Sequence, residues 1–259
     1  MRVVTTCHRQ GYEMYGLRFV QGWSNWPTEA ELYWYTEGFS PPPMDRTTFI
    51  PVDKLESLFN FKQRYSHYQP VDWRWDVARF ANKVFAVRDA LYEYKGIGVW
   101  LDADCVTFEK LPHNLIETLI PSDCYGGFFK RTGFHTETGF WVVDCNHEQH
   151  QAFLDTWCGW YEQNEFRRLP EWTDCHTLDA TIRIFEKQGL IKTHDLSLGS
   201  KSMHPLCEVE LGKYLDHTKG GRKVNGVSPE NKWHVGHLEA VRQRSSVVDR
   251  TEVNGEPGN

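Results

Sequence analysis

The amino-acid sequence predicts one α/β domain with a Rossmann-like, mixed central sheet and a C-terminal extension. Three observations support this fold class: a strand–helix–strand opening, a long amphipathic helix followed at once by a buried strand, and further strands between helices in the second half. The 259 residues are enough to bury a substantial core. We assign residues 1–244 to this domain and expect residues 245–259, which are polar and contain Gly and Pro, to form a poorly ordered tail.

The first elements follow from short-range patterns. Arg2–Cys7 is rich in β-forming residues and predicts the first strand. Apolar residues recur at helical spacing over Tyr12–Trp23, and Asn25-Trp26-Pro27 ends that helix. Glu31–Tyr35 is an aromatic-rich second strand. The stretch 51–70 predicts the end of a strand and then a helix.

The clearest helix spans Asp76–Lys95, where apolar residues recur every three to four positions and Asp76 is suited to cap the N-terminus. Two glycines end this helix, and Ile97–Leu101 follows as a buried strand that leads into Asp102-Ala103-Asp104. Acidic residues at the carboxyl end of a central strand lie where open α/β sheets bind ligands.

The second half predicts strands at Tyr125–Phe129 and Gly139–Asp144 and helices at Gln149–Glu162 and Asp174–Gln188. From Pro205 to His217 the chain is loop-like. We expect the C-terminal extension to fold back over the site.

Bulk properties exclude some functions. The net charge of −6 does not favour non-specific binding of nucleic acid, although Lys219, Arg222 and Lys223 form a local basic cluster. The seven cysteines are scattered, as is typical of free thiols in a reducing compartment. The first residues lack the apolar stretch of a signal peptide, and no apolar run is long enough to span a membrane. We therefore expect a cytoplasmic protein of a bacterium or of a phage-infected host cell.

Asp102 and Asp104 are the centre of the functional prediction. In an extended segment residues i and i+2 point to the same side, so both carboxylates can reach one cation. Mg²⁺ and Mn²⁺ prefer oxygen ligands and are often held by one or two carboxylates together with substrate phosphates. A D-x-D triplet is common by chance, and the alternative is a solvated turn after a strand. The buried strand before it favours the metal site.

The surrounding sequence adds a resemblance. The helix start Trp75–Lys83 and the strand Gly98–Asp104 together resemble the DXD region of GT-A glycosyltransferases, including the capsular-polysaccharide and mannosyltransferase-like group. The resemblance covers residues 73–108. It implies that Arg79 faces the nucleotide-sugar, with Lys83 one turn further along the helix. A surface ion pair is the alternative role for Arg79.

A second motif lies about 110 residues downstream. His217-Thr218-Lys219-Gly220-Gly221-Arg222-Lys223 has the pattern H-x-x-G-x-x-K, which is similar to a C-terminal element of the glycogenin and lipopolysaccharide galactosyltransferase group. The similarity implies that His217 completes the metal site with Asp102 and Asp104, and that Lys223 contacts the diphosphate. Neutral imidazole is a good ligand for Mn²⁺. The Pro-Trp that usually follows the pattern is replaced by Val224-Asn225.

Other candidates lie between and before these motifs. Glu137, just before a predicted strand, is a candidate for binding sugar hydroxyls, and Asp174, at a helix start, for the catalytic base or a donor-sugar contact. A plain N-cap is the alternative role for Asp174. Thr5, Thr6 and His8 follow or end the first strand and could contact the nucleotide, and Asp53 could contact its base or ribose.

These features predict a metal-dependent glycosyltransferase, hexosyl or pentosyl, that uses a nucleotide-diphosphate sugar with Mn²⁺ or Mg²⁺ and retains the anomeric configuration, as the resembling groups do. The acceptor is a glycan or lipid-linked saccharide, or else a hydroxymethylated pyrimidine in bacteriophage DNA, because the chain also resembles small glycosyltransferases encoded by phages. A nucleotidyltransferase and a non-catalytic carbohydrate-binding protein are the alternatives from other classes. The first lacks its glycine-rich phosphate loop here, and the second has no need of both motifs.

Overall fold

The computed structural model describes the backbone of residues 1–252 and the side chains of residues 1–242. The strands are β1 Arg2–His8, β2 Glu31–Glu37, β3 Thr47–Pro51, β4 Ile97–Leu101, β5 Cys105–Thr107, β6 Gly126–Phe129, β7 Glu137–Asp144, β8 Thr193–Asp195 and β9 Leu215–His217. The α-helices are α1 Arg9–Gly11, α2 Leu17–Gly22, α3 Glu56–Arg64, α4 Val77–Leu91, α5 Leu115–Thr118, α6 His150–Glu162, α7 Asp174–Lys187, α8 Arg222–Asn225 and α9 Lys232–Glu252.

Seven strands form a mixed sheet in the order β3-β2-β1-β4-β7-β6-β8. Strand β7 runs antiparallel to both of its neighbours, β4 and β6, and the other pairs are parallel. This confirms the predicted α/β fold with a mixed central sheet. Because β7 runs the opposite way, its first residues lie at the same edge as the last residues of β1, β2, β4 and β6.

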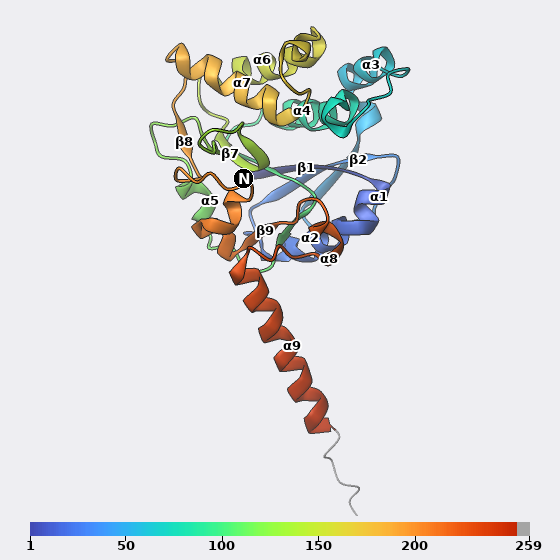
Figure 1. Cartoon of the computed structure of the whole chain (residues 1–259), viewed down its shortest axis with the longest axis vertical. Helices are drawn as coiled ribbons and strands as arrows, with labels where there is room; N and C mark the ends of the chain where they lie inside the picture. The colour runs from blue at the N-terminus through green and yellow to red at the C-terminus, as the bar shows by residue number, and fades with distance from the viewer. Residues whose placement is uncertain (253–259) are drawn as a thin grey trace, which may run out of the picture.

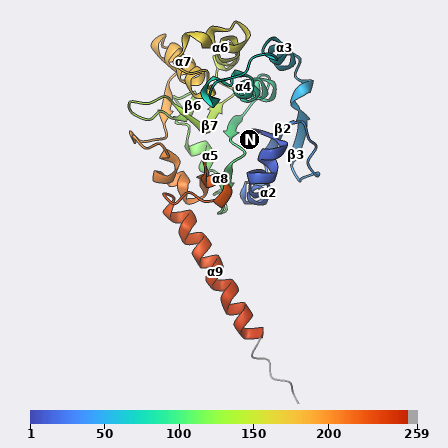
Figure 2. The same cartoon turned by 45° about the vertical axis from the view of Figure 1, so that its right-hand side comes forward.

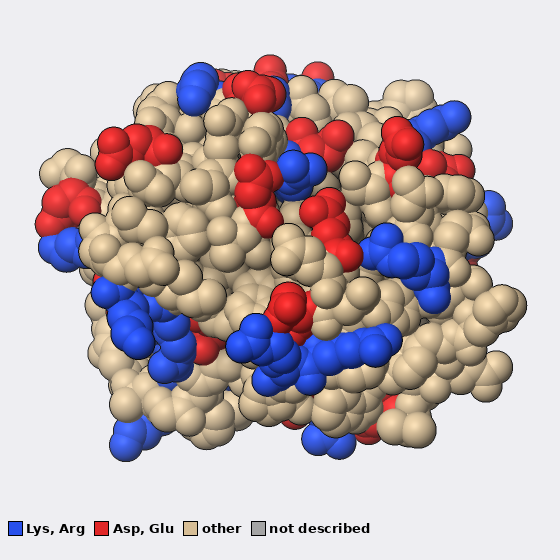
Figure 3. All heavy atoms as spheres, turned by 90° about the horizontal axis from the view of Figure 1, so that it is seen from above, with Lys and Arg blue, Asp and Glu red and all other residues tan. Residues whose placement is uncertain are grey.

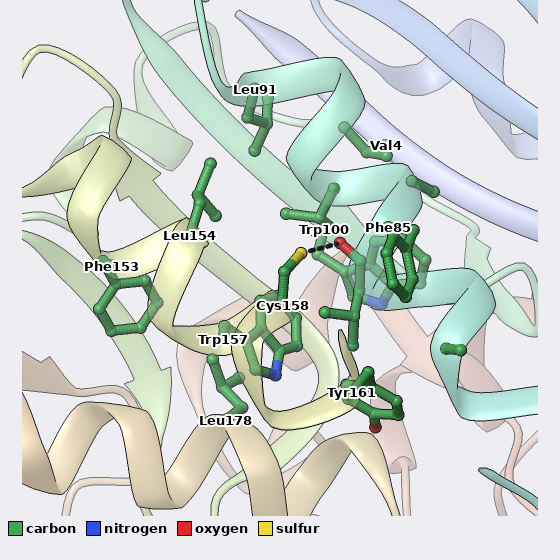
Figure 4. Close-up of a cluster of buried hydrophobic side chains, with 14 of the residues drawn as sticks. Val4, Phe85, Leu91, Trp100, Phe153, Leu154, Trp157, Cys158, Tyr161 and Leu178 are labelled. Carbon is green, nitrogen blue, oxygen red and sulfur yellow. Dashed lines mark hydrogen bonds between the residues drawn. The ribbon is translucent and has the colours of Figure 1, made fainter. Parts of the chain in front are cut away.

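Helices cover both faces of the sheet (Figures 1 and 2). Helices α3, α4, α6 and α7 lie over one face, and α2, α5 and α8 lie on the other side. Alternation along the strands divides the apolar residues between two cores: Val4 and Trp100 pack on the four-helix side, and Val3 and Val99 on the opposite side. Figure 4 shows the first core, where the thiol of Cys158 on α6 donates to the carbonyl of Val84 on α4 at 3.8 Å.

A small second sheet decides how the C-terminal part meets the first half. Strands β5 and β9 pair antiparallel, with Cys105 opposite His217. On β9, the buried carboxylate of Asp216 accepts a 2.7 Å hydrogen bond from the Ser228 amide and lies 2.7 Å from His234 Nδ1. The β5–β9 pairing thus fixes β9 against the segment after the D-x-D triplet, and the Asp216 contacts fix β9 to the chain that follows it.

Several elements differ from the sequence-based expectations. The region 205–217 was expected to be loop-like, but its end forms β9, because a three-residue strand leaves no alternation to detect and is stabilised by a distant partner. Strands β5 and β8, also three residues long, were missed for the same reason. Strand β7 begins at Glu137, two residues earlier than expected.

The C-terminal extension divides in two. The segment containing β9 and α8 lies over the sheet edge, as expected, but α9 runs away from the domain instead of folding back (Figure 1). Of the tail predicted at 245–259, the backbone of 245–252 belongs to α9 and 253–259 lie outside the described residues. Among the described residues, no helix is both long and apolar enough to cross a membrane.

The first core yields a stability prediction. Phe153 is 2% exposed and contacts the rings of Tyr125 and Phe185, so Phe153→Ala removes packing that the surroundings cannot refill. We expect a loss of about 3–5 kcal/mol in the free energy of unfolding, measured by urea denaturation. Phe59→Ala, at a side chain that is 47% exposed, is the matched control and should change it far less. Equal losses would contradict this description of the core.

Candidate functional site

A cavity of about 370 Å³ opens at the sheet edge where the parallel strands end. It is lined by the last residues of β1 and β2, His8 and Glu37, by Asp102 just after β4, and by Glu137 at the start of β7. Side chains from α4 and from the β9–α8 segment close it from two sides. The strand directions therefore gather polar residues that are far apart in the sequence.

The two aspartates of the D-x-D triplet converge on one imidazole. His217 Nε2 lies 3.2 Å from Asp104 Oδ1 and 3.5 Å from Asp102 Oδ2. Trp100 Nε1 donates a 2.7 Å bond to Asp102 Oδ1 and orients that carboxylate. Burial lowers the pKa of His217, but Asp104 and Glu137 outweigh it and raise this pKa to about 9. The protonated imidazole thus offsets the negative charge of the carboxylates, as a bound cation beside them would.

Gly139 makes room for His217. A Cβ added at Gly139 would lie 2.1 Å from two ring atoms of His217, far inside contact distance. The carbonyl of Gly139 accepts the amide of Asp102 at 2.8 Å, so its backbone is fixed on the triplet. The glycine at this position is required by the close approach of the imidazole.

Lys83 forms ion pairs with two carboxylates, one of which belongs to the D-x-D triplet. Its ammonium lies 2.9 Å from Asp102 Oδ1 and 2.5 Å from Asp174 Oδ2. It also donates to the carbonyl of Thr138 at 3.1 Å. Burial disfavours its charged form, but Asp102 and Asp174 outweigh this effect and hold the pKa of Lys83 well above its ordinary value.

Asp174 is the first residue of α7, and Thr173 is the N-cap, whose side chain accepts the amide of His176. The Asp174 carboxylate is buried and accepts the hydroxyl of Thr138 at 2.7 Å, in addition to its pair with Lys83. The N-cap role considered for Asp174 therefore falls to its neighbour, and Asp174 orients Lys83.

The H-x-x-G-x-x-K segment places two lysines in the cavity. Lys223 Nζ lies 2.8 Å from Asp104 Oδ2, and Lys219 Nζ lies 2.8 Å from Glu137 Oε1. Glu137 Oε1 also accepts the amide of Gly139 at 3.0 Å. Its other oxygen, Oε2, is buried without a hydrogen-bond partner. His217 Nδ1 is 3.3 Å from Oε1 but outside hydrogen-bonding geometry.

The residues of β1 that were expected to contact the nucleotide point to opposite faces of the strand. Thr6 and His8 line the cavity, whereas Thr5 is fully buried on the opposite face with no partner for its hydroxyl. Arg79 lines the cavity from α4. No described carboxylate is within ion-pair distance of Arg79, so the surface ion pair considered for it is absent from the described part of the chain. Just after β3, Val52 lines the cavity, whereas Asp53, the candidate contact to base or ribose, does not.

The structure adds lining residues that sequence analysis did not assign to the site: Cys105 behind the triplet and, in the cavity, Tyr15, Glu37, Trp73, Phe80, Asn82, Arg131, His135, Met203 and Lys219. For Lys219 the signal was present, since it lies inside the downstream motif. The others come from strand ends, loops and helices whose approach to one another depends on tertiary packing.

The ligand atoms suit a divalent cation. Asp104, Cys105 and His217 each offer one ligand atom, all within 4.8 Å of one another. The predicted set has Asp102 in place of Cys105. Burial raises the pKa of the Cys105 thiol far above its usual range, so the thiol stays protonated, and Mn²⁺ and Mg²⁺ prefer oxygen to sulfur. The residues present therefore fit a cation held by Asp102, Asp104 and His217.

Comparisons with known proteins complete the description. No family model matches the chain, and no curated protein matches its sequence. Among solved structures, a glycosyltransferase involved in glycosylating the major capsid of PBCV-1 is similar at a TM-score of 0.47 and 12% identity, covering 87% of this chain and 97% of that one.

Two further solved structures are similar. The galactosyltransferase LgtC in complex with donor and acceptor sugar analogues has a TM-score of 0.42 and 12% identity, over 68% of this chain and 69% of that one. Mouse xyloside xylosyltransferase 1 has a TM-score of 0.43 and 10% identity, over 74% of this chain and 83% of that one. At these low values we draw no functional inference from the likenesses.

The contact between Gly139 and His217 gives a prediction for the site. Gly139→Ala places a methyl group where the imidazole lies, so His217 must leave Asp104. We expect Mn²⁺ binding, measured by calorimetry, to weaken by roughly ten- to a hundredfold or more, as when the support of a metal ligand is lost. Gly159→Ala, on α6 with its nearest atom at an ordinary 3.6 Å, is the control. Unchanged binding in Gly139→Ala would remove His217 from the metal site.

The pairing of Lys83 gives a second prediction. Lys83→Met leaves Asp102 and Asp174 without their shared cation, and breaking a buried ion pair costs about 3–5 kcal/mol in the free energy of unfolding. Adding Asp174→Asn removes the fully buried charge, and the double variant should regain part of that loss in urea denaturation. If Asp174→Asn instead adds its own full cost to that of Lys83→Met, the two groups are not coupled as described.

Proposed function

We propose that this chain is a metal-dependent glycosyltransferase that transfers a sugar from a nucleotide-diphosphate sugar to an acceptor hydroxyl. The observation that carries the proposal is the convergence of Asp102, Asp104 and His217 at the carboxyl end of β4, with Lys223 beside them. Carboxylate and imidazole ligands bind the cation, and a lysine adjacent to it suits a second anionic group. A diphosphate bound to the cation meets both requirements.

The leaving group determines the roles of the basic residues. A divalent cation bound at this site would neutralise charge on the departing diphosphate. Lys223, which pairs with Asp104, would be placed to donate to a phosphate oxygen if a cation engaged that carboxylate. Arg79 adds a guanidinium that has no carboxylate partner among the described side chains. These groups stabilise the charge that develops as the glycosidic bond breaks.

The order of the strands orients the donor. Strands β1 and β2 lie on one side of β4, and β7 and β6 lie on the other. We assign the nucleoside to the first side, where Thr6 and His8 line the cavity, and the sugar to the second, beside Glu137. The unpartnered Oε2 of Glu137 is a buried acceptor that a sugar hydroxyl can satisfy, and binding there would remove the cost of leaving that oxygen unpaired.

The charge pairing supports retention of the anomeric configuration. Each carboxylate that lines the cavity is paired with lysine or with His217: Asp102 and Asp174 with Lys83, Asp104 with Lys223, and Glu137 with Lys219, and Glu37 with Lys62. An inverting reaction needs a general base to take the proton of the acceptor hydroxyl, a role that an unpaired carboxylate would fill. Since no unpaired carboxylate is among the described residues that line the cavity, we assign that proton to a departing diphosphate oxygen on the same face of the sugar. Asp174 is then a positioning residue for Lys83.

For the acceptor we favour a saccharide over modified DNA. The basic segment that suggested DNA directs Lys219 and Lys223 into the cavity, where they pair with Glu137 and Asp104. On the face seen in Figure 3, basic and acidic side chains are interspersed instead of forming the continuous basic surface that a polyanion requires.

The proposal predicts turnover that depends on metal and on Asp104. With a panel of uridine and guanosine diphosphate sugars and Mn²⁺, mass spectrometry should detect nucleoside diphosphate release and sugar transfer for one donor. EDTA or Asp104→Asn should lower the rate by roughly a hundredfold or more, because metal coordination supplies several kcal/mol of charge stabilisation. Asp123→Asn, at an exposed acid paired with Lys192, is the control and should leave the rate unchanged. Binding of no donor in the panel would reject the proposal, and mass gain on hydroxymethylcytosine DNA alone would establish the DNA acceptor.

A further inference from the structure

Arg131 is a buried cation without an anionic partner. Its side chain lines the cavity, and the residue is only 3% exposed. Nε and Nη2 donate to the carbonyl of His135 at 3.0 and 2.7 Å, and Nη1 faces the sulfur of Met203 at 3.7 Å. No carboxylate among the described side chains lies within ion-pair distance of it. A guanidinium cannot lose its proton, so its burial without an anion is costly.

The other buried or half-buried cations of the cavity differ in this respect. Lys83, Lys219 and Lys223 each contact a carboxylate within 2.9 Å. Thioether sulfur is a weak acceptor, so Nη1 of Arg131 lacks a strong partner. Among the described side chains, Arg131 is therefore a buried positive charge in the cavity lining that no carboxylate compensates.

The backbone holds this guanidinium in place. Arg131 has a φ of 37°, in the left-handed region, which side chains with a Cβ rarely adopt. The loop after β6 is tied to the loop before η6 (Pro205–Glu208) by the amide of Thr132, which donates to Ser200 at 3.3 Å. Lys219 Nζ donates to the carbonyl of Met203 at 3.1 Å and joins this loop to the H-x-x-G-x-x-K segment. Strain of this kind persists where the surroundings over-determine the conformation, and it is typical of ligand sites.

The position of Arg131 indicates which ligand reaches it. Arg131 follows β6, which lies two strands beyond β4 on the side away from β1 and β2. On the proposed function, on which this inference rests, the nucleoside occupies the β1 side and the diphosphate the end of β4. Arg131 therefore lies past the donor sugar, on the acceptor side. Beside it, Phe134 and Met203 are 44% and 54% exposed and can cover an apolar sugar face.

We propose that Arg131 binds an anionic group, a carboxylate or a phosphate, carried by the acceptor saccharide. A planar guanidinium suits both anions because two parallel N–H groups can donate to two oxygens. The chain thus selects acidic acceptors, such as a uronic acid or a sugar phosphate, over neutral ones.

The test measures binding and turnover separately. Calorimetry with methyl glucuronide, glucose 6-phosphate and methyl glucoside, with and without uridine or guanosine diphosphate and Mn²⁺, should show at least one acidic probe binding roughly tenfold or more tighter than the neutral one, as expected for a charge-assisted pair. Arg131→Gln should abolish the difference, and Arg131→Lys should keep part of it. Arg168→Gln, at an exposed arginine that follows α6 and pairs with Glu165, is the control.

The outcomes separate this inference from the proposed function. With a productive donor, Arg131→Gln should raise the KM for an acidic acceptor more than it lowers kcat. Equal binding of acidic and neutral probes by the wild-type chain, or a preference that survives in a folded Arg131→Gln variant, would overturn the anion site even where transfer occurs. Binding of uridine diphosphate glucuronate and uridine diphosphate glucose is compared in parallel. If Arg131→Gln loses only a preference for the glucuronate donor and not one for an acidic acceptor, the anion that Arg131 binds belongs to the donor and the acceptor proposal is overturned. Absence of any donor turnover counts against the proposed function, while the binding measurement still decides the role of Arg131.

Discussion

The pairing of β5 with β9 is the contact on which the whole site depends. It sets Cys105 opposite His217, and the hydroxyl and amide of Thr218 both donate to the carbonyl of Asp104, at 2.7 and 3.1 Å. The backbone of the first motif is therefore bonded directly to the backbone of the second. Without this two-stranded sheet, the imidazole and the two lysines that follow it would have no fixed relation to the aspartates.

Electrostatic balance then determines the arrangement inside the cavity. Asp104, Glu137 and Asp174 are nearly inaccessible to solvent, and carboxylates at such depth need compensating cations. Lys83, Lys219, Lys223 and a protonated His217 supply that charge in the absence of ligand. On the proposed function, a divalent cation would replace the proton on the imidazole, and phosphate oxygens would replace a carboxylate as the partner of a lysine. Arg131 differs from these buried cations, because no described carboxylate pairs with it.

The two cores hold these groups in position. Trp100 packs in the core below α4 and donates its indole N–H to Asp102, so one side chain joins the packing of the sheet to the position of this carboxylate. Gly139 does the same from β7, because it bonds to the amide of Asp102 and leaves space for His217. Asp102 and His217 therefore lie at strand ends, where the packing of the sheet fixes their backbone.

The sequence by itself determined the α/β class, the helix capped by Asp76, the strand that leads into Asp102 and Asp104, and the two motifs that meet in the cavity. These are local features, fixed by periodicity, capping and the alternation of side chains along a strand. Only the tertiary structure decided which residues meet. The alternation that turns Thr5 into the core and Thr6 into the cavity depends on which face of β1 is covered. The pairing of Lys83 with Asp174, the contact of Lys219 with Glu137 and the isolation of Arg131 each join segments far apart in the chain. No pattern within one segment records such contacts, because they arise from how the sheet orders its strands and from the direction in which β7 runs.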